Sequence, residues 1–439
     1  YNVTGYQTHV PAQNVSLPAP YWGYEGCDAP WSLVASAFQA IEKLGPYDLA
    51  LYTGDLVAHG QTWEESPDMV HYSESALFDI MHRHLQNTTV VAAIGNHDSY
   101  PTENAAPRKL PNGRSSQFSW DWDYVSKLWH QEGWVNERQA QDVRTHYGGY
   151  SITPRRGLRV ITFNTDFWYQ YNFYAYINSA NPDFSGMLRF LTDELLDAEK
   201  NGDRVWIVGH VLTGWNGKEA LASPTNLFYQ IVTRFRSTIA HMFFAHSHED
   251  TFSVYYHNTN GNASSVSQRT QDAVGVALHS PAITPLTNMN PGIRVLHVDP
   301  VTFEIMDYDQ YYASIPTFDD LVESKANHGP VWRKLYSARE AYGDFHASSQ
   351  RNTYKAGVEL DHARWPWNAP LNGTFWAAVT DEMEQRPELV QTWAEYTSSM
   401  SPRAKQCTSK KCQEAVICYM RSGSTNLGLK CNGDYSSFQ

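Results

Sequence analysis

Four short segments of the chain combine carboxylate, amide and imidazole side chains with glycine or alanine. They are Thr53-Gly54-Asp55 followed by His59, Gly95-Asn96-His97-Asp98, Gly209-His210 and Ala245-His246-Ser247-His248. Their donor atoms are nitrogen and oxygen without a thiolate, which suits zinc first and manganese or iron second. Two such ions about 3.5 to 4 Å apart would clamp the attacking and departing oxygens of a phosphoryl transfer. The chemistry expected here is therefore metal-assisted phosphate-ester hydrolysis.

The order of the segments predicts a role for each side chain. Asp55 is expected to bridge the two ions together with a water or hydroxide. Asn96, His210 and His246 would complete one metal position, whereas His248 alone would reach the other. His97 is left as a non-ligand that can contact the phosphate, with Asp98 beside it to orient it. A single histidine after a strand is usually an ordinary core or surface residue, but four such segments favour one shared site.

An apolar run precedes each of the four segments. These runs are Leu49 to Thr53, Val90 to Ile94, Arg204 to Val208 and Met242 to Phe244. Each reads as a buried strand that ends at a small residue, where the backbone can approach a metal closely. The polar side chains should therefore gather at one edge of a layered sheet.

From Cys27 to Cys431 the chain resembles the acid sphingomyelinase family of the calcineurin-like metallophosphoesterases. The resemblance rests on the four segments, on Cys27-Asp28-Ala29-Pro30, on Phe163-Asn164-Thr165, on Tyr176 to Ser179 and on Trp332 to Gly343. It implies two zinc ions held by Asp55, Asn96, His210, His246 and His248. It also implies that His59 and His97 lie by the scissile phosphate, where a protonated imidazole would protonate the leaving oxygen.

The resemblance implies a phosphodiester substrate, with a lipid, sphingomyelin, as the leading expectation. Hydrolysis would give ceramide and phosphocholine through a metal-bridging hydroxide. Two alternatives stay open, because a fold does not fix a substrate. One is a hydrolase of nucleotides or other phosphate esters, and the other is a catalytically silent relative that serves as a binding or assembly scaffold.

The chain departs from the family at the start of its site. The Asp-x-His strand that gives the first metal two ligands is not found, because His9 has no Asp two positions before it. The first metal would then keep only Asp55 and His248, so that one ion could be missing or weakly bound. Smaller departures are Ala245 in place of a usual Gly and Gly60 in place of a frequent Asp.

Five cysteines are an odd number for a disulfide framework. The resemblance pairs Cys407 with Cys412 and Cys418 with Cys431. It gives Cys27 a partner in an associated upstream segment, and a free thiol is the alternative.

Composition favours an exported protein, either secreted or lysosomal or vacuolar. The formal net charge of -13 argues against nucleic acid as a partner. No apolar run approaches the roughly 18 residues of a spanning helix, so a mature soluble product is expected. Clustered cysteines suit an oxidising compartment. Glycosylation sequons occur at Asn2, Asn14, Asn87, Asn262 and Asn372.

The pattern predicts an α/β metallophosphoesterase fold with two packed mixed sheets flanked by helices. A catalytic domain is expected over 1–312, with its first strand missing upstream, and a helical, disulfide-stapled subdomain over 313–439. Helices are expected at Ser32 to Leu44, Ala76 to Leu85, Met187 to Lys200, Phe318 to Lys325, Val331 to Tyr342 and Leu389 to Tyr396. The aromatic run around Trp168, Tyr169 and Tyr171 could form a substrate wall beside the metals, or simply pack in the core.

Overall fold

The structure of the protein is a computed structural model, which describes residues 20–60, 65–107, 118–258, 266–318, 321, 329–345, 364–433 and 435. The predicted helix from Phe318 to Lys325 falls mostly outside these residues, as do Asn2, Asn14 and Asn262.

The largest sheet has six strands in the order β3-β4-β5-β6-β8-β7. Its central strands β4, β5, β6 and β8 run parallel, while β3 and β7 pair antiparallel at the two edges. All six residues of β6 and of β7 are buried, as expected for strands covered on both faces. The bounds are β3 Tyr150–Arg155, β4 Leu158–Thr162, β5 Arg204–Val208, β6 Ile239–Phe244, β7 Thr251–Tyr256 and β8 Ala273–His279.

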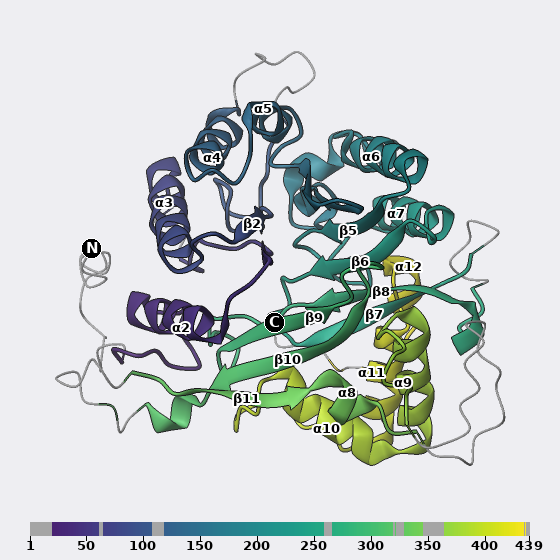
Figure 1. Cartoon of the computed structure of the whole chain (residues 1–439). Coiled ribbons are helices and arrows are strands. Elements are labelled where there is room, and N and C mark those ends of the chain that lie inside the picture. The colour runs from purple at the N-terminus through teal and green to yellow at the C-terminus, as the bar shows by residue number, and fades with distance from the viewer. Residues whose placement is uncertain are drawn as a thin grey trace.

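Two smaller sheets complete the layers (Figure 1). Strands β1 (Leu49–Tyr52) and β2 (Thr89–Ala92) form a parallel pair. Strands β9 (Gly292–Val298), β10 (Ile305–Ala313) and β11 (Trp332–Ser337) form an antiparallel sheet in the order β11-β10-β9. Among the described residues, β1 and β9 each have a paired strand on one side only.

Helices surround these sheets. Several helices begin at residues that favour a helix N-terminus. Ser66 caps α3, with Pro67 in its first turn, Asn136 forms a capping box with Gln139 at the start of α5, and the Asn372 side chain caps α9. The helix bounds are α2 Trp31–Leu44, α3 Pro67–His84, α4 Trp120–Gln131, α5 Glu137–Thr145, α6 Met187–Asn201, α7 Ala222–Arg234, α8 Ala338–Tyr342, α9 Gly373–Gln385, α10 Pro387–Thr397, α11 Lys410–Met420 and α12 Thr425–Gly428.

The structure confirms the predicted mixed α/β class and most predicted elements. The four apolar runs overlap strands β1, β2, β5 and β6, and helices α2, α6 and α10 lie where they were expected. Helix α3 begins at Pro67, nine residues before the predicted start at Ala76.

The prediction of a helix from Val331 to Tyr342 is wrong for its first half. Trp332–Ser337 is strand β11, and only Ala338–Tyr342 is helical. Pairing with β10 overrides the local preference, and Lys334 Nζ lies 2.6 Å from Asp309 Oδ1 across the two strands.

The C-terminal helices share a hydrophobic core with the sheets. Trp376 of α9 is fully buried against Phe252 of β7, and Trp393 of α10 is buried against Trp215. The predicted second domain also contributes β11 to the sheet of β9 and β10. The division at residue 312 remains a prediction.

The two predicted disulfides are present. Cys407 is bonded to Cys412 and Cys418 to Cys431. Cys27 is exposed and has no disulfide partner among the described residues. Within the described part of the chain, the helices are all too short or too polar to cross a bilayer.

Candidate metal centre

Strands β1 and β2 deliver Asp55 and Asn96 side by side. Their parallel register pairs Tyr52 with Ala92, so the two following turns emerge together. Glycine is required at this meeting point, because a Cβ on Gly54 would lie 2.6 Å from the Gly95 nitrogen. A Cβ on Gly95 would in turn lie 2.2 Å from Asp55 Oδ1.

The Asp98 carboxylate holds the two turns together. It accepts hydrogen bonds from the backbone N–H groups of Asp55 at 2.9 Å, Leu56 at 2.6 Å and Gly95 at 2.8 Å. Burial, followed by the charge of Asp55, raises the pKa of Asp98 to about 6. Asp98 therefore organises the backbone under the site, and no hydrogen bond from it to the His97 ring occurs among the described residues.

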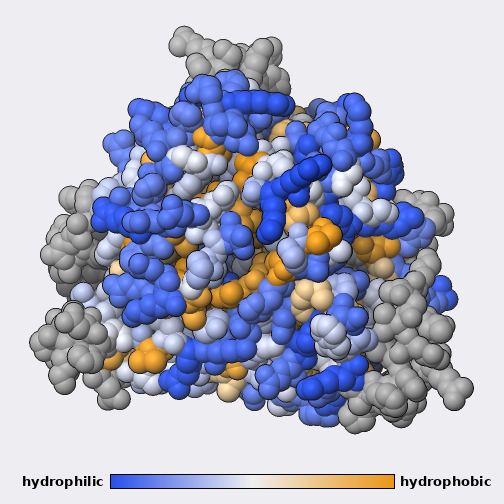
Figure 2. Space-filling model, in the orientation of Figure 1, coloured by the Kyte–Doolittle hydropathy of each residue, from blue (hydrophilic) through white to orange (hydrophobic). Residues whose placement is uncertain are grey.

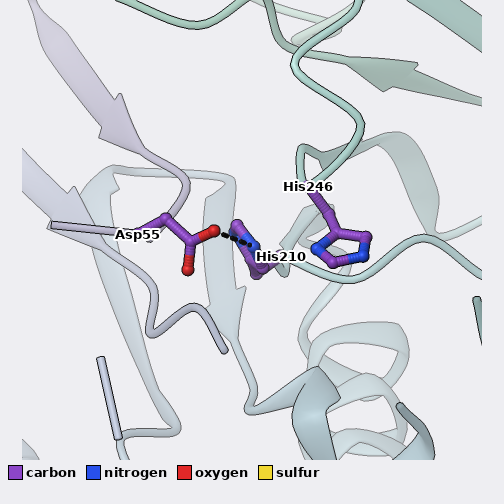
Figure 3. A group of neighbouring side chains, drawn as sticks. All are labelled: Asp55, His210 and His246. Carbon is purple, nitrogen blue, oxygen red and sulfur yellow. Dashed lines mark ion pairs between the residues drawn. The ribbon is translucent and has the colours of Figure 1, made fainter. Parts of the chain in front are cut away.

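Four donor atoms from four loops converge on one point. Asn96 Oδ1 lies 3.0 Å from His210 Nε2 and 2.9 Å from His246 Nδ1. Asp55 Oδ2 lies 3.0 Å from the same His210 nitrogen. Figure 3 shows the Asp55 carboxylate and the His246 ring on either side of His210.

In His210 and in His246, the ring nitrogen that faces away from the centre has a hydrogen-bond partner that fixes the orientation of the ring. His210 Nδ1 lies 2.7 Å from the Thr53 carbonyl oxygen, so this nitrogen donates and Nε2 is turned toward the centre. His246 Nε2 lies 3.3 Å from Glu219 Oε2, which leaves Nδ1 facing the centre. A carbonyl or carboxylate behind each imidazole is the usual arrangement for metal-binding histidines.

This donor set fits a divalent cation. A carboxylate, an amide oxygen and two imidazole nitrogens present lone pairs to the same point, and only a proton or a metal ion can satisfy them together. Although burial lowers it, the neighbouring Asp55 raises the pKa of His210 to about 9. A bound metal ion would displace a proton from this nitrogen.

Three residues of the centre have a left-handed backbone. Asp55, His246 and His248 have φ angles of 63°, 70° and 62°. Such conformations are unfavourable for non-glycine residues and persist where the surrounding structure fixes them, often at functional sites. Ala245 has no positive φ and donates its N–H to the His210 carbonyl at 2.9 Å.

His59, His97 and His248 form a group of imidazoles close to one another. The rings of His59 and His97 lie 3.9 Å apart, and the His59 and His248 rings 5.5 Å apart. The backbone N–H of His97 donates to Asp55 Oδ1 at 2.9 Å. The Nδ1 atoms of His97 and His248 are buried and have no hydrogen-bond partner among the described residues.

His59 and His97 differ in their electrostatic surroundings. His59 Nδ1 lies 3.0 Å from Asp28 Oδ1. Burial lowers the pKa of His59, but the contact with Asp28 raises it more, so the pKa lies above its ordinary value. Burial, with repulsion from the neighbouring histidines, lowers the pKa of His97 to about 4. His59 is therefore the more readily protonated of the two.

The three residues of the predicted aromatic wall lie in different places: Trp168 is in the core, whereas Tyr169 and Tyr171 are near the site. Trp168 is buried, packs on Phe163 and Phe228 and donates its Nε1–H to the Val211 carbonyl. Tyr169 packs edge-on against the His246 ring at 4.9 Å, and Tyr171 is exposed beside it.

A groove of about 1410 Å³ includes Asp55, His59 and His248 in its lining, together with residues of strands β1 and β9. Figure 2 shows an apolar strip running through the hollow on this face of the molecule.

Sequence reasoning missed Glu219 and the pairing of Asp28 with His59. Glu219 lies in a turn without any motif, and Asp28 precedes His59 by 31 residues, so only the folded chain brings them to the site. Of the predicted glycosylation residues that are described, Asn87 is exposed and Asn372 is half-buried with its side chain capping α9.

The chain is similar to known phosphoesterases. The family model described as calcineurin-like phosphoesterase matches residues 8–250. Sphingomyelin phosphodiesterase 1 of Caenorhabditis elegans is 31% identical over 94% of this chain and 65% of its own length. Sphingomyelin phosphodiesterase of Homo sapiens is 31% identical over 74% of this chain and 48% of its own length. A cyclic GMP-AMP phosphodiesterase of Homo sapiens is 26% identical over 78% of this chain and 72% of its own length.

The chain thus spans between about half and two thirds of the length of the two sphingomyelin phosphodiesterases. The matched region contains every segment that supplies a donor atom to the centre, and the predicted resemblance to the acid sphingomyelinases is confirmed. The chain belongs to the calcineurin-like phosphoesterase family.

Proposed function

We propose that the chain is a metal-dependent phosphodiesterase whose centre is formed by Asp55, Asn96, His210, His246 and His248. The observation that carries the proposal is the convergence of Asp55 Oδ2, Asn96 Oδ1, His210 Nε2 and His246 Nδ1. Two divalent ions, zinc in the first instance, would stabilise charge on the phosphate and lower the pKa of an attacking water. The substrate would reach the centre beside His59 and His97.

His59 is the proposed proton donor to the leaving oxygen. Its pKa is raised by Asp28, whereas that of the neighbouring His97 is lowered, so one imidazole of the pair is cationic under mildly acidic conditions. The neutral His97 is then free to hydrogen-bond to a phosphate oxygen. Asp98 would act through the backbone that carries Asp55 and His97.

The second metal position would take Asp55 and His248, and we propose that further donors complete it. In this proposal Cys27 pairs with a cysteine of an associated segment, as the resemblance implies; Cys27 is exposed and has no disulfide partner among the described residues.

The proposed substrate class is a phosphodiester lipid, with sphingomyelin first. The sphingomyelin phosphodiesterase relatives and the exposed Tyr171 beside Tyr169 support it, since an aromatic face can bind a quaternary ammonium head group. Secretion or a lysosomal location is proposed on the two disulfides, which form in oxidising compartments.

Metal analysis and hydrolysis of the purified chain test the proposal together. The expected result is two catalytic-site ions per chain, with turnover of bis-p-nitrophenyl phosphate and of sphingomyelin. His246→Ala should remove one ion and lower turnover more than about 100-fold, because loss of even an outer partner of a metal ligand costs 10- to 100-fold. His82→Ala, an exposed histidine of α3, should leave both unchanged.

The outcomes separate the alternatives. Metal binding with turnover of a cyclic dinucleotide but not of sphingomyelin would favour a nucleotide hydrolase. One ion or none, without any turnover, would contradict the enzyme and favour a binding or assembly scaffold.

A further inference from the structure

A second group of side chains that could hold a metal ion lies on α3 and α4, separate from the Asp55 centre. His71 and Glu74 are three residues apart on α3, and Asp121 is in the first turn of α4. One donor atom from each of the three side chains lies within 4.8 Å of the other two. Residues three apart on a helix face the same side, so α3 presents an imidazole and a carboxylate toward the Asp121 carboxylate.

Both carboxylates of this group are buried and have no hydrogen-bond partner among the described residues. Glu74 is 0% exposed and Asp121 is 2% exposed. None of their four oxygens has a hydrogen-bond partner within the described ranges. Buried charge without compensation costs several kcal/mol or more. Something must therefore neutralise the pair.

A shared proton is one candidate for that role. Burial raises the pKa of both carboxyls well above ordinary values, and the charge of Asp98 adds to the effect. A shared proton, however, would draw the two carboxyls together into a hydrogen bond, and no such bond is formed. Donor atoms a few ångströms apart without mutual hydrogen bonds match the spacing around an ion bound at about 2.0 to 2.2 Å.

The His71 ring is held in the orientation of a ligand. Its Nε2 is buried without a partner in the described structure, while the ring hydrogen-bonds to the backbone of Trp120. Tyr124 stacks on the ring at a centroid distance of 3.7 Å, and its hydroxyl donates to the His71 carbonyl oxygen at 3.2 Å. A backbone partner on one nitrogen fixes the imidazole so that the other nitrogen points at the metal.

We propose that His71, Glu74 and Asp121 bind one divalent transition-metal ion that ties α3 to α4. One imidazole and two carboxylates suit zinc, manganese or iron(II), with water completing the coordination. The site shares no ligand with the Asp55 centre. It lies close enough for Asp98 to act electrostatically on both carboxyls, so the ion would support the turn that carries Asn96 and Asp98.

Metal counting on matched variants of the full chain tests the site. Glu74→Gln combined with Asp121→Asn removes two carboxylates with little change in shape. Asp79→Asn combined with Asp123→Asn removes two exposed carboxylates from the same helices, and so makes the same change in net charge. After loading with Zn²⁺ and removal of free ion, the buried double variant should hold one ion fewer per chain than the wild type. The exposed double variant should hold the same number.

A His246→Ala background separates this site from the other centre. In that background Zn²⁺ should still raise the Tm, EDTA should reverse the rise, and Glu74→Gln with Asp121→Asn should abolish it. An unchanged ion count and an unchanged or higher Tm in the folded buried double variant would overturn the site and indicate protonated carboxyls. If that variant does not fold, His71→Gln, which keeps the carboxyls, should lose the same ion, and retention of the ion there would also overturn the proposal.

Discussion

Asp28 is the residue that distinguishes His59 from the other histidines near the centre. Its Oδ1 lies 3.0 Å from His59 Nδ1, and its Oδ2 accepts the His59 backbone N–H at 2.6 Å. Thr284 donates a further hydrogen bond at 3.1 Å, which holds the carboxylate in place. Burial opposes the ionised form of Asp28, yet these contacts lower its pKa, so the carboxylate remains charged. The result is a fixed anion behind the imidazole.

Replacement of Asp28 by Asn should move the alkaline limb of the activity profile to lower pH. In the proposed mechanism activity requires protonated His59, so activity should fall as the pH rises through the pKa of His59. Asp28 raises that pKa, and its loss lowers it. The measurement is kcat/KM for bis-p-nitrophenyl phosphate as a function of pH.

The control for this prediction is Glu42→Gln. Glu42 lies 2.7 Å from His84 and forms a comparable pair on the surface, away from the centre. Its loss should not move the limb. An unchanged limb in Asp28→Asn, with reduced kcat at every pH, would exclude His59 as the titrating acid.

Sequence reasoning identified the residues that carry motifs at strand ends. Asp55, Asn96, His210 and His246 follow apolar strands, and strand ends at one edge of a layered fold meet predictably. The groups that hold the other ring nitrogens of His210 and His246 could not be identified in this way, because Thr53 contributes a backbone carbonyl and Glu219 lies in a turn. Their contribution depends on side-chain packing that no local pattern records.

At the scale of elements, β11 shows where local pattern fails. The segment from Trp332 to Ser337 contains residues compatible with either a helix or a strand. Strand β10 pairs with β11 on one side and with β9 on the other, and Asp309 of β10 forms an ion pair with Lys334 of β11. Non-local pairing therefore decides its conformation. By contrast, the buried strands β5 and β6 were predictable because both of their faces are apolar.

Helix α9 should stabilise the sheets as well as the C-terminal helices. Trp376 is fully buried, with its ring 4.3 Å from Phe252 of β7 and stacked on Tyr308 of β10 at 6.2 Å. Trp376→Ala should lower the free energy of unfolding by about 3 to 5 kcal/mol, because it leaves a large cavity. The measurement is denaturant unfolding followed by far-ultraviolet and near-ultraviolet circular dichroism.

Trp367→Ala is the matched control, since Trp367 is 84% exposed. It should change stability by less than about 0.5 kcal/mol. With one shared core, the two probes should shift together in Trp376→Ala. Two separate transitions, only one of which shifts, would instead show that 1–312 and 313–439 unfold independently.

At the scale of the whole molecule, the negative net charge opposes electrostatic binding to anionic membranes. The formal net charge is -13 at pH 7, while the apolar groove and the histidine-lined centre are local features. An anionic surface should repel the molecule beyond the short range of those features. The 18 histidines change this balance, because each gains a positive charge on acidification unless its surroundings prevent it.

Binding to lipid vesicles should therefore reverse its charge preference near the isoelectric point of about 5.7. At pH 7, vesicles of phosphatidylcholine containing phosphatidylserine should bind less protein than vesicles of phosphatidylcholine alone. Below the isoelectric point, the vesicles that contain phosphatidylserine should bind more protein than those of phosphatidylcholine alone. Salt should reduce the difference between the two vesicle types at either pH, because the Debye length falls to about 10 Å at 0.1 M. Co-sedimentation at two salt concentrations measures this. Strong, salt-sensitive binding to the anionic vesicles at pH 7 would contradict the argument, because it would require a basic surface strong enough to outweigh the net charge.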